Sequence, residues 1–252
     1  MLKVHPLPAP QFGESNYIWM LQEGRNWALI DPTDADTVLR FLGAKEGDRL
    51  TAIYLTHHHL DHTAGVAQLQ YFYPGVRVQE NHQRGKKAGE VLESFSFAGH
   101  KITQLFTGGH TLDHVVYRVE DSVDHIFCGD VLFSCGCGRA DDGSLKELFA
   151  ALNWFKTLPE ETLFYPAHEY TRSNLAFARN IDQDNPDIVA RQQALVQIGV
   201  SLPTSLQQEK KINPFLRLQE QGVLSGLKRI TGQRPSTEYA AFCMLRQLKN
   251  AS

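Results

Sequence analysis

The chain has 252 residues, of which 42% are hydrophobic and 21% are charged. This composition excludes wholesale disorder, and the length allows one large domain or one domain with a smaller companion. The formal net charge of −3, without any Lys/Arg-rich run, gives no reason to expect nucleic acid as a partner. The N-terminus lacks the long apolar stretch of a signal peptide, and no apolar run is long enough to cross a membrane. We therefore expect a cytoplasmic protein without a membrane partner, unless a targeting segment has been removed.

Predicted strands and helices alternate along the first two thirds of the chain. Strands are expected at 16–21 and 27–31, followed by a helix over 35–42 with Asp34 as its N-cap. A strand at 51–56 leads into a helix from about 62 to 72, which Pro74-Gly75 ends. The remaining elements of this part are short strands at 76–79, 94–98, 101–106, 115–119, 125–128 and 163–165, and a helix at 144–157.

The last part of the chain has a different pattern. From about residue 171 onward the apolar residues follow mainly helical spacing, which Asn213-Pro214-Phe215 interrupts. Helices are expected at 174–180, 187–200, 222–230 and 237–249. The order of elements therefore predicts an α/β (α+β) region followed by a helical tail of roughly 80 residues.

One six-residue segment contains several candidate metal ligands. His57, His59, Asp61 and His62 offer four metal-ligating side chains between a predicted strand and a predicted helix. Imidazole and carboxylate suit zinc, iron or manganese, and strand-to-helix loops are common places for sites in α/β proteins. An expression tag is excluded because the cluster is internal and interrupted by other residues. His58 lies between two candidates in an alternating segment, so we expect its side chain to point away.

Three later residues stand where predicted strands end. His110 follows Gly108-Gly109, Asp130 follows Cys128-Gly129, and His168 follows Pro166-Ala167. A sandwich fold can bring such strand ends to one rim. We therefore expect two metal positions that share Asp130, one formed by His57, His59 and His110 and the other by Asp61, His62 and His168. The other histidines, at 5, 82, 100, 114 and 125, lack this context and are expected to be exposed or hydrogen-bonded.

The cysteines do not suggest a second metal site. Cys135-Gly136-Cys137 lacks C-x-x-C spacing and has no partner pair, which excludes a zinc ribbon. We interpret these residues as small buried thiols in a tight turn.

Motifs along the chain resemble those of metallo-β-lactamase-fold hydrolases, and more narrowly those of glyoxalase II (hydroxyacylglutathione hydrolase). The ligand segments from Thr56 to His62, Gly109-His110-Thr111 and Gly129-Asp130 specify only the superfamily. The narrower match lies in Gly136–Arg139, His168–Thr171, Ile212–Arg217 and Leu245–Lys249. The resemblance implies an αββα sandwich over residues 1–170 and a small all-helical substrate-binding domain over 171–252.

The resemblance also implies the reaction. The family hydrolyses the thioester S-D-lactoylglutathione to D-lactate and glutathione, and a hydroxide held between two divalent metals attacks the carbonyl. We expect zinc at both positions, although iron and manganese accept the same donors. Asp130 would bridge the metals, and Asp61 would also orient the hydroxide; both are therefore expected to be catalytic. The enzyme is expected to be a monomer with a small-molecule substrate.

Four residues match family positions that bind glutathione: Arg139, Tyr170, Arg246 and Lys249. Glutathione has two carboxylates, and Arg and Lys supply the cations that such groups need. Without the resemblance, the i,i+3 spacing of Arg246 and Lys249 would favour a solvated helix face. Arg139 is the better candidate on position alone, because it follows a glycine-rich turn near Asp130.

The sequence departs from the family pattern in four places: Gly108, Asp113, Ala140-Asp141-Asp142 and Asn250. Asp141 matters most, because an acid near the glutathione carboxylates would repel them. We therefore expect a weakened affinity for the thioester or a shifted substrate preference. An alternative is a hydrolase of the same fold that acts on another thioester or an ester such as a lactone. A non-hydrolytic redox protein would need a flavin domain, which the helical tail cannot supply.

Overall fold

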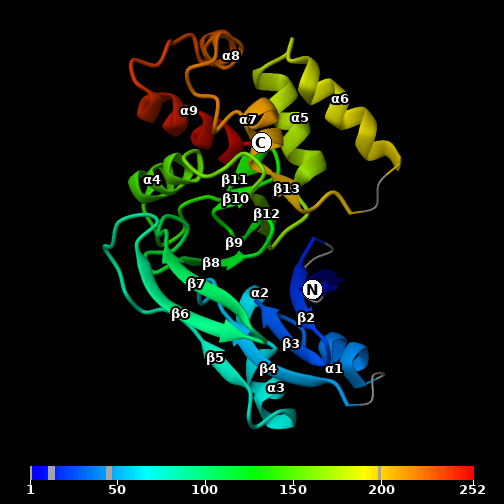
Figure 1. Ribbon diagram of the computed structural model, residues 1–252. Coiled ribbons are helices and arrows are strands. Elements are labelled where there is room, and N and C mark those ends of the chain that lie inside the picture. The colour runs from blue at the N-terminus through cyan, green and yellow to red at the C-terminus, as the bar shows by residue number, and fades with distance from the viewer. Residues whose placement is uncertain (1, 11–14, 44–46, 198–199) are drawn as a thin grey trace.

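The computed structural model describes residues 2–10, 15–43, 47–197 and 200–252, and it shows two β-sheets stacked face to face with helices outside them (Figure 1). The first sheet has the order β1-β2-β3-β4-β5 and the second β13-β12-β9-β8-β7-β6. Helices α1 and α3 cover the outer face of the first sheet, and α4 with the C-terminal helices covers the second. This arrangement is the expected αββα sandwich.

The first sheet begins as an antiparallel meander and continues as parallel strands. Strands β1, β2 and β3 pair antiparallel, and β3, β4 and β5 pair parallel through helical crossovers. Its elements are β1 (Lys3–Pro8), β2 (Tyr17–Glu23), β3 (Asn26–Ile30), α1 (Ala35–Gly43), β4 (Arg49–Tyr54), α2 (Leu60–Thr63), α3 (Val66–Phe72) and β5 (Arg77–Gln79).

The second sheet is antiparallel except where β9 and β12 run parallel. Its strands are β6 (Val91–Phe97), β7 (His100–Phe106), β8 (Val115–Glu120), β9 (Asp124–Gly129), β12 (Leu163–Pro166) and β13 (Thr204–Ser205). Between β9 and β12 lie the hairpin of β10 (Leu132–Phe133) and β11 (Gly136–Cys137), and the helix α4 (Leu145–Phe155).

The C-terminal segment is mainly helical, as expected. It contains α5 (Thr171–Ile181), α6 (Pro186–Ala194), the 3-10 turn η2 (Leu195–Gln197), α7 (Leu206–Ile212), α8 (Gln221–Thr231) and α9 (Glu238–Asn250). The segment also contributes β13, which pairs with β12 at the edge of the second sheet. Among the described residues, no helix combines the length and apolarity needed to cross a membrane.

Alternation along β8 shows how the sequence builds the layers. Val115, Tyr117 and Val119 face the first sheet, whereas Val116 faces the helices on the other side. Period-two alternation places successive side chains on opposite faces, so a strand that is buried on both faces is mainly apolar, and β8 is apolar except for Arg118 and Glu120. The candidate ligands follow strands of both sheets, β4 in the first and β7, β9 and β12 in the second.

The helix predicted over 62–72 is divided in the structure. α2 ends at Thr63 and α3 begins at Val66, with Gly65 between them. The Gly65 N–H donates to the carbonyl of Pro32, and a Cβ on Gly65 would lie 2.5 Å from that oxygen. A long-range backbone contact therefore divides a segment that helical periodicity predicts to be continuous. The helix predicted over 187–200 is also shorter, because α6 gives way to η2 at Leu195.

The expectation for the cysteines of the tight turn is confirmed. Cys135 and Cys137 are both buried in the β10–β11 hairpin, and Cys128 is buried at the end of β9. Burial raises the pKa of the Cys135 thiol well above its ordinary value.

Candidate metal centre

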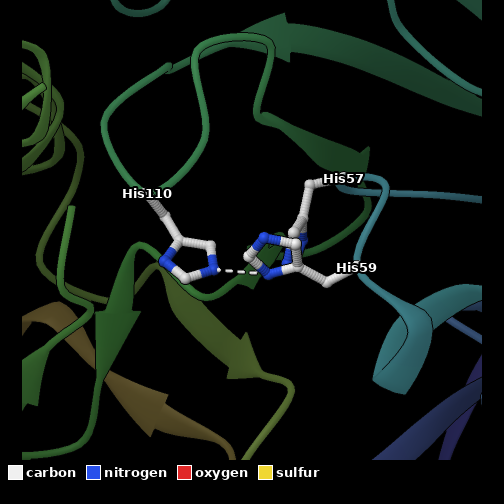
Figure 2. A group of neighbouring side chains, drawn as sticks. All are labelled: His57, His59 and His110. Carbon is white, nitrogen blue, oxygen red and sulfur yellow. Dashed lines mark hydrogen bonds between the residues drawn. The ribbon is translucent and has the colours of Figure 1, made fainter. Parts of the chain in front are cut away.

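Loops and the short helix α2 at one rim of the sandwich bring together all seven residues predicted as metal ligands. The loop after β4 supplies His57 and His59, which converge with His110 from the loop between β7 and β8 (Figure 2). The His110 Nε2 and His59 Nδ1 atoms lie 3.2 Å apart. One ring nitrogen from each of the three histidines lies within 4.8 Å of the others, close enough for all three to contact one ion.

A second cluster lies beside the first. Asp61, His62 and His168 also bring one ligand atom each within 4.8 Å of one another. Asp130 lies between the two clusters: its Oδ1 is 3.6 Å from His62 Nε2 and 3.4 Å from His168 Nε2. Its Oδ2 is 3.7 Å from His110 Nε2. The two oxygens of one carboxylate therefore face different clusters.

Several polar atoms at the centre of these clusters are buried without a hydrogen-bond partner. They include His57 Nε2, His62 Nε2 and Asp130 Oδ1. A buried polar atom without a partner costs roughly 1–3 kcal/mol, so proteins rarely leave three in one place. Their donor types, imidazole nitrogen and carboxylate oxygen, are those that divalent transition metals prefer. The residues present fit a dinuclear metal site.

Asp31 fixes the orientation of two of the imidazoles. Its Oδ2 accepts hydrogen bonds from His62 Nδ1–H at 3.0 Å and from the Thr56 hydroxyl at 2.7 Å. The Thr56 oxygen in turn accepts from His57 Nδ1–H at 3.0 Å. Each bond places the proton on Nδ1 and leaves the Nε2 lone pair facing the cluster, as outer hydrogen bonds of metal-binding histidines do. Asp31 is not among the residues predicted from the sequence, although it stands at the end of a predicted strand, as three of the predicted ligands do.

His110 and Asp130 are held in the same way by groups outside the clusters. His110 Nδ1–H donates to the Arg139 carbonyl at 2.8 Å. The Asp130 N–H donates to His114 Nε2 at 3.3 Å, and His114 Nδ1 lies 3.0 Å from the Thr107 hydroxyl. His114 is thus a buried, hydrogen-bonded histidine, as expected, but it also supports the site.

The electrostatics favour the deprotonated form of His57 and Asp130 but the protonated form of His62. Burial and the neighbouring imidazoles hold the pKa of His57 well below its ordinary value, so its ring is neutral. Burial alone would raise the pKa of Asp130, but the rings of His168, His62 and His110 hold it below its ordinary value. Burial would lower the pKa of His62, whereas the carboxylates of Asp130, Asp31 and Asp61 raise it to about 9. A cation bound here would displace the His62 proton, as metal binding to histidine generally does.

A cavity of about 420 Å³ opens onto the clusters. All four predicted substrate-binding residues line it: Arg139, Tyr170, Arg246 and Lys249. Tyr170 stacks on His168, with ring centroids 4.9 Å apart. Lys249 lies over the Phe177 ring at 5.3 Å, and the Arg246 guanidinium lies over Phe215 at 5.4 Å. Spacing alone predicted that Arg246 and Lys249 lie on a solvated helix face. This prediction is wrong, because Arg246 is buried and Lys249 is half-buried.

One acid of the atypical segment, Asp141, lines this cavity. Asp141 Oδ1 is 3.0 Å from Arg139 Nε, so the two side chains form an ion pair. His58 lies 3.5 Å from Asp113 and 3.7 Å from Asp142 and is largely exposed. The remaining histidines lie away from the clusters. His5 contacts Gln22, His82 contacts Glu80, His100 contacts Glu23 and His125 contacts Tyr165.

Comparison with known proteins places this geometry in a family. Residues 12–168 match the sequence model of the metallo-β-lactamase superfamily, and residues 169–252 match that of the hydroxyacylglutathione hydrolase C-terminus. The chain is 37% identical to a hydroxyacylglutathione hydrolase of Neisseria meningitidis serogroup A over 253 residues, which cover 99% of each chain. It is 39% identical to a hydroxyacylglutathione hydrolase of Vibrio cholerae serotype O1, again over 99% of each.

A solved structure shares the fold. ETHE1 from Myxococcus xanthus superimposes with a TM-score of 0.63 at 24% identity, covering 98% of this chain and 99% of that one. The first part of the chain matches the superfamily, the second part matches the hydroxyacylglutathione hydrolase C-terminus, and the two relatives with that name match 99% of the chain. The chain therefore belongs to the hydroxyacylglutathione hydrolases of the metallo-β-lactamase superfamily.

Proposed function

We propose that this protein hydrolyses S-D-lactoylglutathione to D-lactate and glutathione at a dinuclear metal centre. The observation that carries the proposal is the bridging geometry of Asp130, which joins two His-rich clusters at the end of a cavity lined by cations. The relatives named hydroxyacylglutathione hydrolase support the choice of thioester.

Seven residues would hold the two ions. His57, His59 and His110 would bind the first, and Asp61, His62 and His168 would bind the second, with Asp130 between them. When bound, two divalent ions lower the pKa of water toward neutrality and polarise the thioester carbonyl. We propose zinc at both positions because the donors are mainly imidazole, with iron and manganese as the other candidates.

Asp61 and Asp130 would act as the catalytic carboxylates. Asp61 is the more exposed of the two, so its free oxygen can accept a hydrogen bond from the attacking water and orient it. Asp130 is buried, and as the carboxylate between the two clusters it would help to hold both ions. The leaving group is a thiolate, which departs without a strong general acid because thiols are much more acidic than alcohols or amines.

The cavity residues would bind the glutathione part. Arg246 and Lys249 present positive charge to the cavity, Arg139 lies at its mouth, and Tyr170 forms part of its wall. Residues 1–170 would then form the catalytic domain and 171–252 the substrate-binding domain. We also propose that the enzyme is a monomer.

A comparison of three substrates tests the proposal. The metal-loaded protein is supplied with S-D-lactoylglutathione, with a thioester of a small uncharged thiol, and with a lactone, and kcat/KM is measured for each. We expect the glutathione thioester to be preferred by at least about a hundredfold, since only it can pair with the cavity cations. Preference for the lactone, or equal rates with both thioesters, would refute it.

A further inference from the structure

The β10–β11 hairpin connects the metal centre with the helical segment. Asp130 immediately precedes the hairpin and Arg139 follows it, and the Arg139 carbonyl accepts the hydrogen bond from His110. The Gly138 N–H donates to the Val131 carbonyl, and a Cβ on Gly138 would lie only 1.8 Å from the Asp130 carbonyl oxygen. The base of the hairpin is therefore in close contact with Asp130, and a shift of the hairpin would move both Asp130 and His110.

A single carboxylate, Glu209 of α7, holds the turn of this hairpin. Glu209 is fully buried and accepts hydrogen bonds from the Ser134 hydroxyl at 2.9 Å and from the Cys135 N–H at 2.7 Å. It also accepts from the Thr204 hydroxyl at 2.7 Å and from the Asn213 amide at 2.9 Å. A buried carboxylate is costly unless it is hydrogen-bonded, and these four donors satisfy it only in this position. The four hydrogen bonds therefore fix the Glu209 side chain.

The backbone at the turn needs such support. Cys135 has φ of +59°, a left-handed conformation that costs a residue with a side chain about 1 kcal/mol or more. The hydrogen bond from its N–H to Glu209 stabilises this conformation. Without the carboxylate, the turn can relax to an ordinary conformation, which would displace the strands on either side.

Three more side chains of the helical segment donate to carbonyls of the same hairpin. Asn213 donates to Gly136 at 2.9 Å, Asn174 donates to Ser134 at 3.0 Å, and Arg246 donates to Cys137 at 2.8 Å. The hairpin consequently depends on helices α5, α7 and α9 for its hydrogen bonds.

We infer that Glu209 is a positioning residue for the metal centre, which acts through the β10–β11 hairpin on Asp130 and His110. The inference rests on the dinuclear centre proposed above. It means that the helical segment does more than bind substrate: a carboxylate that lines no part of the cavity sets the affinity for metal.

The test measures metal binding rather than turnover. Metal-free wild type and the Glu209→Ala variant are titrated with Zn2+ against a chromophoric chelator, and the visible spectrum is recorded after loading with Co2+. We expect Glu209→Ala to raise the Kd of at least one metal position tenfold or more and to change the Co2+ bands, which report ligand geometry. A wild-type Kd and spectrum in this variant would overturn the inference.

Asn185→Ala is the matched control. Asn185 is buried in the same segment, caps α6 and donates to Asp182 and the Lys211 carbonyl, without contact to the hairpin. Its loss removes buried hydrogen bonds of the helices alone, so the Zn2+ Kd and the Co2+ spectrum should stay as in the wild type. Equal weakening in both variants would show a general loss of packing and would contradict a positioning role.

Two further variants keep the test decisive. Glu209→Gln can still accept from Cys135 and Asn213 through its carbonyl while its amide donates to the two hydroxyls, so it should restore the Kd to within about threefold. If Glu209→Ala does not fold, Asn213→Ala, which releases the Gly136 carbonyl, should weaken Zn2+ binding in its place. A wild-type Kd for Asn213→Ala would then overturn the inference. If the wild type itself binds fewer than two Zn2+ ions, the proposed function fails instead.

Discussion

Asp130 differs from the other proposed ligands because its two oxygens face different clusters. Asp130→Asn retains the shape of the side chain but removes its charge and one acceptor. We expect kcat to fall at least about a hundredfold and bound metal to drop below two ions per chain, as for loss of a shared ligand. Metal analysis and thioester hydrolysis measure both effects. Two ions and unchanged kcat in the variant would argue against a bridging role.

Asp141 is expected to weaken substrate binding, and the structure gives the reason. Its carboxylate pairs with Arg139 at 3.0 Å, so a glutathione carboxylate must compete for the same guanidinium. Asp141→Asn should lower KM for S-D-lactoylglutathione about two- to fivefold with little change in kcat, because the gain is in ground-state binding. Asp142→Asn is the control, since Asp142 lies near His58 and not in this ion pair. An unchanged or higher KM in Asp141→Asn would contradict the prediction.

Lys249 should make substrate affinity depend on pH. Burial and the nearby Arg246 guanidinium lower the pKa of Lys249 from its ordinary value of 10.5. A lysine attracts a carboxylate only while protonated, so this attraction is present below its pKa and is lost as pH rises through it. KM of the wild type should therefore begin to rise below pH 10.5, whereas KM of Lys249→Arg should stay flat, because arginine does not lose its proton. Parallel KM profiles for the two proteins would exclude this role.

At the scale of elements, Gly65 lies between α2 and α3, and a Cβ there would be only 2.5 Å from the Pro32 carbonyl oxygen. Gly65→Ala should lower the free energy of unfolding by about 1–3 kcal/mol, the usual cost of overpacking. Gly75→Ala serves as the comparison, since nothing lies within 4 Å of its Cβ position. Thermal unfolding of both variants measures the difference. Equal stabilities would show that the contact does not constrain the position of α2, which carries His62.

The sequence predicted most elements and the clustering of the seven candidate ligands, because strong periodicity marks the strands and the candidates follow strand ends. It did not predict β1, β13 or α7, whose two to seven residues carry too little periodic signal. Asp31, Thr56 and Glu209 were missed for another reason. Each is a single polar residue that makes at least one contact with a distant part of the chain, Asp31 with Thr56 and His62, and Glu209 with Ser134, and only the folded chain shows these contacts.

At the scale of the whole molecule, the second sheet and the helical segment share one hydrophobic core. Ile126 and Phe164 of the sheet pack in the same cluster as Phe177, Phe215 and Phe242 of the helices. Neither part can separate without exposing these side chains to water. We expect a single cooperative unfolding transition, with equal calorimetric and van't Hoff enthalpies. Two resolved transitions in calorimetry would show that the two proposed domains unfold independently.

The most direct test of the account is a titration of the metal-free protein with Zn2+ while the loss of the S-D-lactoylglutathione thioester is followed by absorbance. The seven candidate ligands form two clusters joined by Asp130, so full activity should require both positions to be filled. The account predicts that the rate rises to a plateau at two equivalents of Zn2+ per chain. A protein that binds two equivalents and leaves the thioester intact would contradict it.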